Sequence, residues 1–428
     1  MTVKVGLVGT GTVGGGCLDI LANHAEDFKR NYGVDIQLAG VCSREREKAQ
    51  EYGVEDLFTE DYKELIANPD IDVIIELIGG TGIARQVIMD AREAGKHVVT
   101  ANKAVMASYG EEVFAAAEKQ GLQVFFGASV GGGIPIIGPM RHSLIANQVT
   151  KIMGIVNGTT NYMLTRMNDN GLTYDAALKE AQELGYAEAD PTADVDGFDA
   201  AAKIAILASL AFHTEVKMSD VYTEGIRHLH PVDFSTARDM GYAVKLVAHA
   251  NLTDEGVFVR VHPTMLPLDH QMANVNGVFN AIYVVGDAVG QTMFFGEGAG
   301  AGPAASAVMG DVVELARRIQ LGIPCDTGSP VTQKLPLVAM DELETKYYIR
   351  FKVADRPGVL AASAAEFSKA GVSVKSVSQR GTSKRDDVNL VFVTHTAKES
   401  DIRAAIEAIL KLDNVVTGGF PAVIRVEE

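Results

Sequence analysis

Hydrophobic and polar positions recur in different patterns along the chain and divide it into three parts. From the first residue to about Gly133, short apolar runs are followed by stretches of helical periodicity. The apolar runs are Val3–Val8, Gln37–Cys42, Val73–Ile78, His97–Thr100 and Gln123–Phe126, and the helical stretches include Ile83–Ala94 and Ser108–Gln120. Such alternation predicts an α/β fold whose parallel sheet is covered on both faces.

A different pattern occupies residues 134–330. Strand-like runs at Lys151–Val156, Val257–His262, Ala281–Val285 and Thr292–Phe295 surround helices near Asp175–Leu184 and Asp199–Phe212. This mixture predicts an α+β domain, and we expect its helix at residues 303–320 to pack back on the first domain. Residues 331–346 are expected to form a linker, and residues 347–428 a small unit that begins in the order βαβ.

The glycines of Gly9–Gly14 match the pattern G-x-G-x-x-G and lie between the first strand and the first helix. Gly9 allows a tight turn, Gly11 allows a pyrophosphate to approach the backbone, and Gly14 allows helix and strand to pack closely. This placement favours a Rossmann-type dinucleotide-binding domain at residues 1–133 over a purely structural turn. We expect the cofactor to contact Gly9, Thr10, Gly11, Thr12, Val13 and Gly14.

The end of the second strand bears on the choice of cofactor. An acidic residue there would bind the ribose 2′-hydroxyl of NAD, but the chain has Ser43 and Arg44. A hydroxyl and a guanidinium suit a 2′-phosphate, so NADP(H) is favoured while NAD(H) stays possible. The alternative is an exposed arginine that opens a solvated helix. A second glycine-rich loop, Gly296–Pro303, either passes close to the cofactor or is only a flexible turn.

Lys203 is unusual because it lies in an otherwise apolar stretch, Asp194–Ala208, that is typical of a buried helix. Asp199 is one helical turn before it, and Asp196 is a further turn back, near the same face. Burying an ammonium is costly unless it is paired. The Lys203–Asp199 pair is therefore either a structural ion pair or a group that transfers a proton to a small polar substrate.

Composition narrows the class of function. The formal charge of −17 argues against nucleic acids and anionic membranes as partners. No stretch is long and apolar enough to cross a bilayer, and the first residues lead into a strand rather than a secretion signal, so we expect a cytoplasmic protein. Cys17, Cys42 and Cys325 lack the spacing of metal ligands, and none is well placed as a nucleophile.

Several motifs occur together in a fixed order. Besides Gly9–Gly14 and the run from Asp194 to Lys203, they are Thr100–Lys103, Ala128–Pro135, Asn157–Asn161 and Gly185–Pro191. In this order, roughly the first three quarters of the chain resemble homoserine dehydrogenase, which implies that the α+β domain at residues 134–330 binds substrate and takes part in dimerisation. The segment Asp355–Leu360 resembles the start of an ACT domain, the amino-acid-sensing module appended to many members of that family, which implies a βαββαβ order for residues 347–428.

The resemblance implies the reversible, NAD(P)H-dependent reduction of L-aspartate 4-semialdehyde to L-homoserine, in threonine, methionine and isoleucine biosynthesis. It assigns the catalytic lysine to Lys203, a cofactor-side lysine to Lys103, and the substrate-binding acids to Glu188 and Asp199. Further substrate contacts are expected at Asn157, Thr159, Gly185 and Tyr186, and further cofactor contacts at Thr100, Lys103 and Gly300. We expect Lys203 to be the acid and base and Lys103 its electrostatic partner, although these two roles are open to exchange.

The resemblance also implies a sodium ion at the loop Ala128–Pro135, held by the backbone oxygens of Val130, Gly132 and Ile134. The chain departs from the family pattern at Gly127, where many relatives have Glu, so any side-chain contribution from that position is lost. The alternative function of the loop is a glycine hinge between domains.

The C-terminal unit is expected to provide feedback regulation. Asp355 and Gly358 lie at a strand-to-helix turn, where the amino end of the helix would hold the carboxylate of an amino acid and Asp355 its ammonium. Threonine is the first candidate for this inhibitor, and the alternative is a module kept only for assembly. Because ACT units usually pair edge to edge, the resemblance implies a homodimer or homotetramer.

Two other classes of function remain open from the sequence. One is another NAD(P)-linked amino-acid or hydroxy-acid dehydrogenase, which substrate profiling would separate from a homoserine dehydrogenase. The other is a non-enzymatic sensor of nucleotides and amino acids. The set Lys103, Glu188, Asp199 and Lys203 argues against the sensor.

Overall fold

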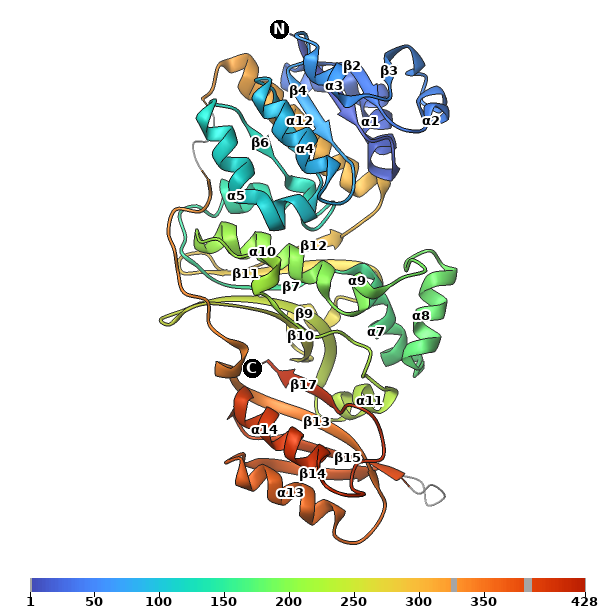
Figure 1. The fold of residues 1–428 in the computed structure, drawn as a ribbon, viewed down its shortest axis with the longest axis vertical. Helices are drawn as coiled ribbons and strands as arrows, with labels where there is room; N and C mark the ends of the chain where they lie inside the picture. The colour runs from blue at the N-terminus through green and yellow to red at the C-terminus, as the bar shows by residue number, and fades with distance from the viewer. Residues whose placement is uncertain (1, 325–328, 381–386, 428) are drawn as a thin grey trace. The chain divides into compact units, whose positions relative to one another are not determined.

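The computed structural model describes residues 2–324, 329–380 and 387–427, so Cys325 lies outside the described residues (Figure 1). The chain divides into two compact units. The first comprises Met1–Val156, Ala202–Val221 and Phe279–Leu335, and the second comprises Asn157–Ala201, Tyr222–Val278 and Pro336–Glu428. In the described residues, no helix is long and apolar enough to cross a membrane.

A parallel sheet forms the first part of the first unit. Its strands are β1 (Thr2–Val8), β2 (Asp35–Cys42), β3 (Phe58–Thr59), β4 (Val73–Glu76), β5 (His97–Thr100) and β6 (Val124–Phe125). They lie in the order β3-β2-β1-β4-β5-β6, and each neighbouring pair is parallel. The predicted parallel sheet is thus confirmed. The sequence pattern did not predict β3, because a strand of two residues shows no recognisable apolar run.

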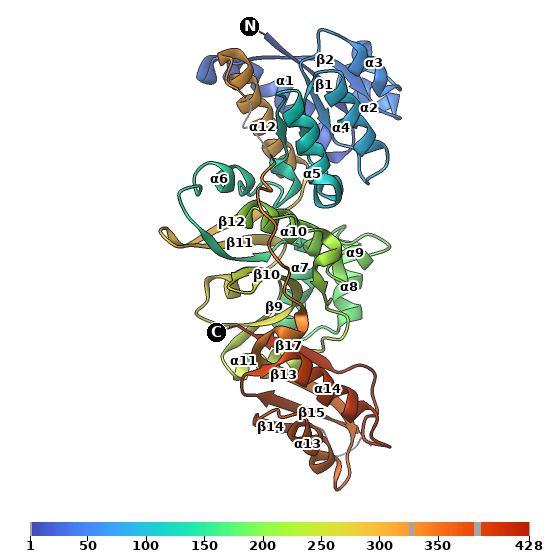
Figure 2. The same ribbon diagram turned by 60° about the vertical axis from the view of Figure 1, so that its left-hand side comes forward.

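Helices cover both faces of this sheet, as the alternation of strands and helices predicts (Figure 2). On one face, α1 (Thr12–Tyr32) and α12 (Ala301–Leu321) share a core with β1 and β2. On the other face, α3 (Tyr62–Ala67), α4 (Ile83–Glu93) and α5 (Lys103–Lys119) pack on β4 and β5. A short helix, α2 (Arg46–Glu51), follows β2. The helix expected from Ser108 begins five residues earlier, because the side chain of Asn102 accepts a hydrogen bond from the backbone of Val105 and caps it.

The first unit also contains antiparallel strands. β11 (Phe279–Gly286) pairs with β7 (Val149–Ile155) on one side and with β12 (Gly290–Glu297) on the other. The short helix α6 (Ile137–Arg141) precedes β7. These three strands confirm the strand-like runs seen in the sequence.

The prediction of a single helix over residues 194–208 is wrong at its start. The chain forms α9 (Thr192–Val195) and then α10 (Phe198–Phe212), and Gly197 between them has φ +87°. This left-handed backbone, which glycine adopts without strain, ends one helix before the next begins. Asp196 consequently lies outside α10, and its carboxylate accepts hydrogen bonds from Arg227 at 2.5 and 3.0 Å.

The second unit contains one sheet in the order β9-β10-β17-β13-β15-β14. Its strands are β9 (Tyr242–Thr253), β10 (Gly256–Pro267), β13 (Glu344–Ala354), β14 (Val374–Arg380), β15 (Asp387–Thr394) and β17 (Ala422–Val426). Two short strands, β8 (Tyr222–Thr223) and β16 (Ala397–Lys398), pair with β10 and β13 respectively. The helices α7 (Gly158–Asn170), α8 (Tyr174–Glu183) and α11 (Pro231–Asp239) also belong to this unit.

The C-terminal segment has the predicted βαββαβ order. α13 (Val359–Lys369) follows β13, α14 (Glu399–Leu410) precedes β17, and both helices share one core with β13 and β15. The segment does not form an independent domain with its own sheet, however, because β17 pairs in parallel with β10 at Thr264 and Met265. The segment therefore continues the sheet of the β9–β10 hairpin.

A buried ion pair connects β13 to α11 within this unit. The carboxylate of Asp233, which has no exposed surface, accepts hydrogen bonds from Arg350 Nε at 2.6 Å, from Arg350 Nη2 at 3.1 Å and from Tyr348 Oη at 2.7 Å. The side chain of Arg350 is 7% exposed. Removing one partner would leave the other charge buried and uncompensated.

We predict that Asp233→Ala lowers the free energy of unfolding by about 3–5 kcal/mol, because the guanidinium of Arg350 loses its carboxylate. Urea unfolding followed by circular dichroism measures this change. The control is Glu407→Ala, since Glu407 and Lys411 are 70% and 78% exposed and lie 3.9 Å apart. Equal effects of the two substitutions would show that the Asp233 pair does not stabilise the unit.

Candidate active site

A cleft of about 350 Å³ lies in the first unit beyond the carboxyl ends of β1, β4 and β5. Ligands of parallel sheets bind at this edge, where neighbouring strands lead away in opposite directions. The walls come from the start of α1, the loops after β4 and β5, the loop at residues 128–132, α10, and the glycine loop before α12. The residues are Thr12, Val13, Leu77, Ile78, Gly79, Gly80, Ala101, Asn102, Lys103, Ala104, Ala128, Ser129, Gly132, Lys203, Gly298, Ala299, Gly300 and Ala304.

The glycine turn at the start of α1 is tightly packed. Gly9 has φ +104°, and its backbone N–H donates to Cys42 O at 2.9 Å. A Cβ atom on Gly14 would lie 2.0 Å from Gly9 O, so only glycine allows α1 to approach the turn. Gly11 is different, because a Cβ there would meet no atom within 4 Å. That open space is where the sequence pattern expects a pyrophosphate.

The end of β2 contacts this turn through side chains. Thr10 Oγ1 donates a hydrogen bond to Ser43 Oγ at 2.6 Å, and Thr10 is 3% exposed. Arg44, the next residue, is exposed to solvent. Ser43 is thus fixed next to the glycine turn, whereas the guanidinium of Arg44 reaches solvent.

Lys103 is the first residue of α5 and is held in place by its neighbour Asn102. The amide of Asn102 donates to Ile78 O and Gly80 O, both at 2.8 Å, and its oxygen caps α5. Two loops that form the cleft are therefore joined by one side chain. The exposed Lys103 lines the cleft where these loops meet.

Glu76, at the end of β4, supports the same loops from beneath. Its carboxylate has no exposed surface and accepts hydrogen bonds from Thr100 Oγ1 and from the backbone of Ile78, both at 2.6 Å. Burial raises the pKa of Glu76 to about 7, although the hydrogen bonds from Thr100, Ile78 and Asn102 oppose that change. The sequence pattern did not single out Glu76, whose one signal is that an acid ends the apolar run Val73–Ile75.

Lys203 reaches the cleft from α10 and is almost fully buried, with 8% of its surface exposed. Its ammonium donates a hydrogen bond to Val156 O at 2.6 Å. Lys103 and Lys203 thus line one cleft and both belong to the first unit, whereas the sequence suggested that they come from separate domains.

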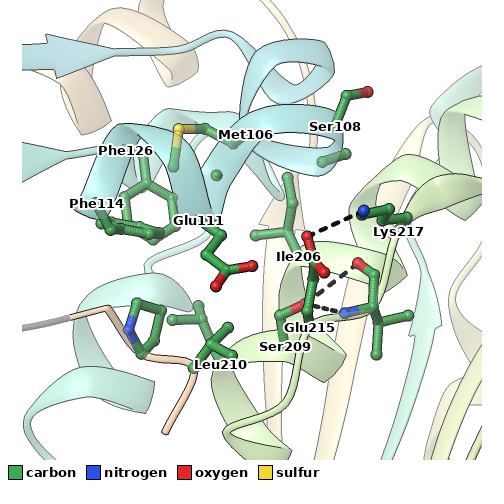
Figure 3. A pocket seen from close by; sticks show the side chains of 15 residues that line it. Met106, Ser108, Glu111, Phe114, Phe126, Ile206, Ser209, Leu210, Glu215 and Lys217 are labelled. Atoms are coloured by element: carbon green, nitrogen blue, oxygen red, sulfur yellow. Dashed lines mark hydrogen bonds and ion pairs between the residues drawn. The ribbon is translucent and has the colours of Figure 1, made fainter. Parts of the chain in front are cut away.

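A small cavity of about 40 Å³ separates α5 from α10 on the side shown in Figure 3. Apolar side chains from both helices line it, among them Met106, Phe114 and Leu210. On α10, Ser209 Oγ accepts a hydrogen bond from the backbone of Val216 at 3.0 Å. This volume is too small for a cofactor, so we assign the cavity to the packing that holds the two lysine-bearing helices.

The expected substrate residues form hydrogen-bonded groups in the second unit. Asn157 caps α7, and its amide donates to Asp194 at 2.6 Å and to Asp199 at 3.0 Å. Thr159 Oγ1 donates to Tyr186 O at 2.5 Å. Gly185 has φ +76° and precedes the half-exposed Tyr186, and Glu188 is exposed. The structure thus joins Asn157 to Asp199 and Thr159 to Tyr186.

Three comparisons bear on this architecture. Residues 135–313 match the homoserine dehydrogenase family, residues 9–127 its NAD-binding domain, and residues 347–414 the ACT domain. The chain is 43% identical to a homoserine dehydrogenase of Neisseria gonorrhoeae over 418 residues, which cover 96% of each sequence. The chain belongs to the homoserine dehydrogenase family.

Solved structures of homoserine dehydrogenases agree with this fold. The enzyme from Thiobacillus denitrificans matches with a TM-score of 0.93 and 41% identity, covering 100% of this chain and 99% of that one. A hyperthermophilic archaeal homoserine dehydrogenase mutant, solved in complex with NADPH, matches with a TM-score of 0.65 and 27% identity, covering 76% of this chain and 99% of that one. The chain is therefore an oxidoreductase of the homoserine dehydrogenase family that acts on a CH–OH group and carries a nucleotide-binding domain and an ACT domain.

Two glycines give a left-handed backbone to the loop where the family resemblance implies sodium. Gly131 and Gly132 have φ +79° and +54°, and a Cβ on Gly132 would lie 2.5 Å from Gly298 O. Val130 and Ile134 are buried on either side. Among the described residues, no group of three or more His, Cys, Asp or Glu side chains is placed to hold a metal ion.

At Gly127, a carboxylate from α12 occupies the space that a side chain would need. Asp311 Oδ2 accepts a hydrogen bond from the backbone of Gly127 at 2.7 Å, and a Cβ at Gly127 would lie 2.9 Å from both carboxylate oxygens. Burial raises the pKa of Asp311 to about 7, opposed by that hydrogen bond and by the charge of Arg141. A buried acid from another helix thus lies at the position where many relatives have Glu, and nothing local in the sequence links Asp311 to Gly127.

The two residues expected to bind a regulatory amino acid lie at the turn before α13. Gly358 is the N-cap of α13 with φ +93°, and Asp355 Oδ1 accepts a hydrogen bond from Gln379 Nε2 at 2.9 Å.

Cys17 and Cys42 are buried, and burial raises the pKa of their thiols to about 12 and about 11. Neither thiol is therefore a ready nucleophile at neutral pH.

We predict that Glu76 and Asp311 make the protein less stable as pH rises from about 4 to about 7. Their pKa values are about 7 in the folded protein and 4.5 and 3.8 ordinarily, so the folded state keeps protons that the unfolded state releases. The contribution of these two acids to the free energy of unfolding should be highest below the ordinary pKa values, decline up to about pH 7 and then level off.

Urea unfolding of the wild type and of the Glu76→Gln/Asp311→Asn variant between pH 5 and 8 measures this effect, since the amides keep the shape without the charge. The variant should have the flatter profile over this range. Parallel profiles for the two proteins would contradict the assignment to these two acids.

Proposed function

We propose that the cleft binds NADP(H) and that Lys203 is the acid and base in the reversible reduction of L-aspartate 4-semialdehyde to L-homoserine. The observation that supports this proposal most directly is that Lys103 and Lys203 line the same cleft as Thr12 and Val13 after the glycine turn. A nucleotide on that turn would have two ammonium groups close to it.

The chemistry assigned to the protein is charge stabilisation and proton transfer. NADP(H), when bound, supplies or accepts the hydride. As the aldehyde carbon is reduced, its oxygen gains negative charge, and an ammonium near that oxygen lowers the barrier and donates the proton. In the oxidation of homoserine the same lysine takes the hydroxyl proton. We assign the proton to Lys203 and the electrostatic role to Lys103, with exchange of the two roles as the alternative.

The substrate proposal rests on acids that are already fixed. Asp199 is 7% exposed and accepts a hydrogen bond from Asn157, which holds its carboxylate in one orientation. We assign the substrate ammonium to Asp199 and Glu188. Asn157, Thr159, Gly185 and Tyr186 complete this set as the groups that shape the site around the substrate.

The preference for NADP(H) rests on Ser43 and Arg44, which follow β2 at the position that contacts the adenosine ribose in this type of fold. Ser43 is hydrogen bonded to Thr10, and Arg44 is exposed, so both are available to a 2′-phosphate. The archaeal relative solved with NADPH supports this choice. Two further residues are assigned to the cofactor site. Thr100 contributes indirectly, because its hydroxyl donates a hydrogen bond to Glu76, and Gly300 lines the cleft.

The remaining proposals concern ions, regulation and assembly. Backbone oxygens of Val130, Gly132 and Ile134 would hold sodium, with the Asp311 carboxylate contributing negative charge nearby. Threonine would bind at Asp355 and Gly358 and inhibit the enzyme as the end product of a cytoplasmic threonine, methionine and isoleucine pathway. The ACT domain supports an amino-acid regulator, and we propose a homodimer or homotetramer.

We predict that Lys203→Ala lowers kcat/KM for homoserine by roughly 100- to 10,000-fold, because positioned proton transfer contributes that much. The dissociation constant of NADPH should change little, since the lysine serves the reacting oxygen. Absorbance of the reduced nicotinamide measures the first quantity, and fluorescence titration the second.

The matched control is Lys217→Ala, which removes an exposed lysine that pairs with Glu215 at 3.4 Å in the same unit. Its activity should remain that of the wild type. Wild-type turnover in Lys203→Ala, or faster oxidation of malate or glutamate than of homoserine by the wild type, would refute the proposed function.

We predict that Arg44→Ala raises KM for NADPH by roughly tenfold and leaves KM for NADH unchanged, because only NADPH carries the phosphate that the guanidinium would contact. Steady-state assays with each cofactor measure the two constants. Arg46→Ala is the control, because Arg46 packs over the ring of Phe58 at 5.5 Å. Equal changes for both cofactors would mean that Arg44 does not read the 2′-phosphate.

A further inference from the structure

A second cavity, of about 390 Å³, lies in the second unit and is distinct from the residues assigned above. It is formed where the β9–β10 hairpin meets the start of β13 and the end of β17. Its walls therefore come from both the hairpin and the ACT segment. Apolar groups such as Phe258, Leu343 and Val426 line it together with polar ones.

Arg260 lines this cavity and is 6% exposed. Its guanidinium lies over the ring of Phe258 at 4.6 Å, and its Nε donates to His262 Nε2 at 3.2 Å. Its Nη1 is buried and has no hydrogen-bond partner among the described residues. Burial lowers the pKa of Arg260 to about 10, although the charge of Glu427 opposes that change. A buried guanidinium with an unused donor is costly, and an anionic ligand would relieve that cost.

Asn251 provides a second unused group beside Arg260. In the register of the hairpin, Asn251 lies opposite Phe258, and His249 lies opposite Arg260, so all four side chains share one face of the sheet. Asn251 Oδ1 is buried and has no hydrogen-bond partner within the described chain. The cavity is thus lined by one buried donor, Arg260 Nη1, and one buried acceptor, Asn251 Oδ1, that both lack a hydrogen-bond partner within the described chain.

The rim of the cavity carries the opposite charge. Glu255 and Glu344 line it and are exposed, and Glu342, paired with Lys398 at 2.6 Å, lies beside them. A simple anion entering toward Arg260 would meet these carboxylates. A molecule with a carboxylate at one end and an ammonium at the other matches both the floor and the rim.

We propose that this cavity binds a small amino-acid zwitterion, with its carboxylate accepting from Arg260 Nη1 and its ammonium donating to Asn251 Oδ1 and directed toward Glu255 and Glu344. The volume of about 390 Å³ suits a ligand of this size. The ligand would contact β9 and β10 on one side and the ends of β13 and β17 on the other. This site shares no residue with the proposed contacts at Asp355 and Gly358, so each can be removed without the other.

The test is calorimetric titration of the full-length protein with L-threonine, L-valine and glycine at millimolar concentration, with acetate as a carboxylate that lacks the ammonium. The amino acids should bind and acetate should not. Arg260→Gln and Asn251→Leu should each weaken binding at this site by roughly tenfold or more, and Glu344→Gln by less, because its carboxylate stays hydrated. The matched control Glu407→Gln, an exposed glutamate on α14, should bind as the wild type does.

Asp355→Asn separates this site from the end of α13. Amino-acid binding that survives Asp355→Asn and is lost in Arg260→Gln supports the proposal. Binding that is lost in Asp355→Asn but unchanged in Asn251→Leu and Glu344→Gln overturns it, as does a wild type that binds none of the amino acids. If Arg260→Gln fails to fold by circular dichroism, Asn251→Leu and Glu344→Gln decide the question.

Discussion

The hydrogen bond from the buried ammonium of Lys203 to Val156 O is the constraint on which the cleft depends. A lysine in an apolar helix needs a fixed acceptor to compensate its lost hydration, and Val156 O at 2.6 Å is such an acceptor. This hydrogen bond orients the nitrogen of Lys203. The backbone that carries Lys103 is placed in a complementary way, by the Asn102 cap and the loops that Glu76 supports. Hydrogen bonds thus hold the nitrogen of Lys203 and the start of the helix that carries Lys103, which limits the reorganisation needed when a substrate oxygen becomes negative.

The sequence was most informative where one local pattern dictates structure. Apolar runs buried on both faces identified the parallel strands, and Gly9 and Gly14 identified a turn that no larger residue would allow. It was least informative where distant residues meet. The break at Gly197 is a positive-φ position that resembles any other glycine in sequence, and nothing local links Asp311 to Gly127. The buried Glu76 could not be recognised as such, because in sequence an acid after an apolar run looks like the polar residue that ordinarily ends a strand.

The strand β9 was not predicted for a related reason, since it too buries polar residues. One face of the β9–β10 hairpin carries Lys245, His249, Arg260, His262 and Thr264, which would suggest a surface strand. All five are nonetheless buried, at most 6% exposed, and most of their polar atoms are hydrogen bonded, such as Lys245 Nζ to Val275 O at 2.5 Å. A buried polar layer of this kind specifies one arrangement of its strands strongly, because any other pairing leaves charges without partners.

The place of β17 has a consequence for how the polypeptide reaches its native state. This strand, the last in the described chain, lies between β10 and β13 and hydrogen bonds to both. During synthesis β10 leaves the ribosome well before β17, so this edge of β10 stays open until the ACT segment follows. Loop-closure entropy makes such a long-range pairing slow, and an open strand edge invites association with other nascent chains. The ACT segment thus also closes a strand edge of the domain that precedes it.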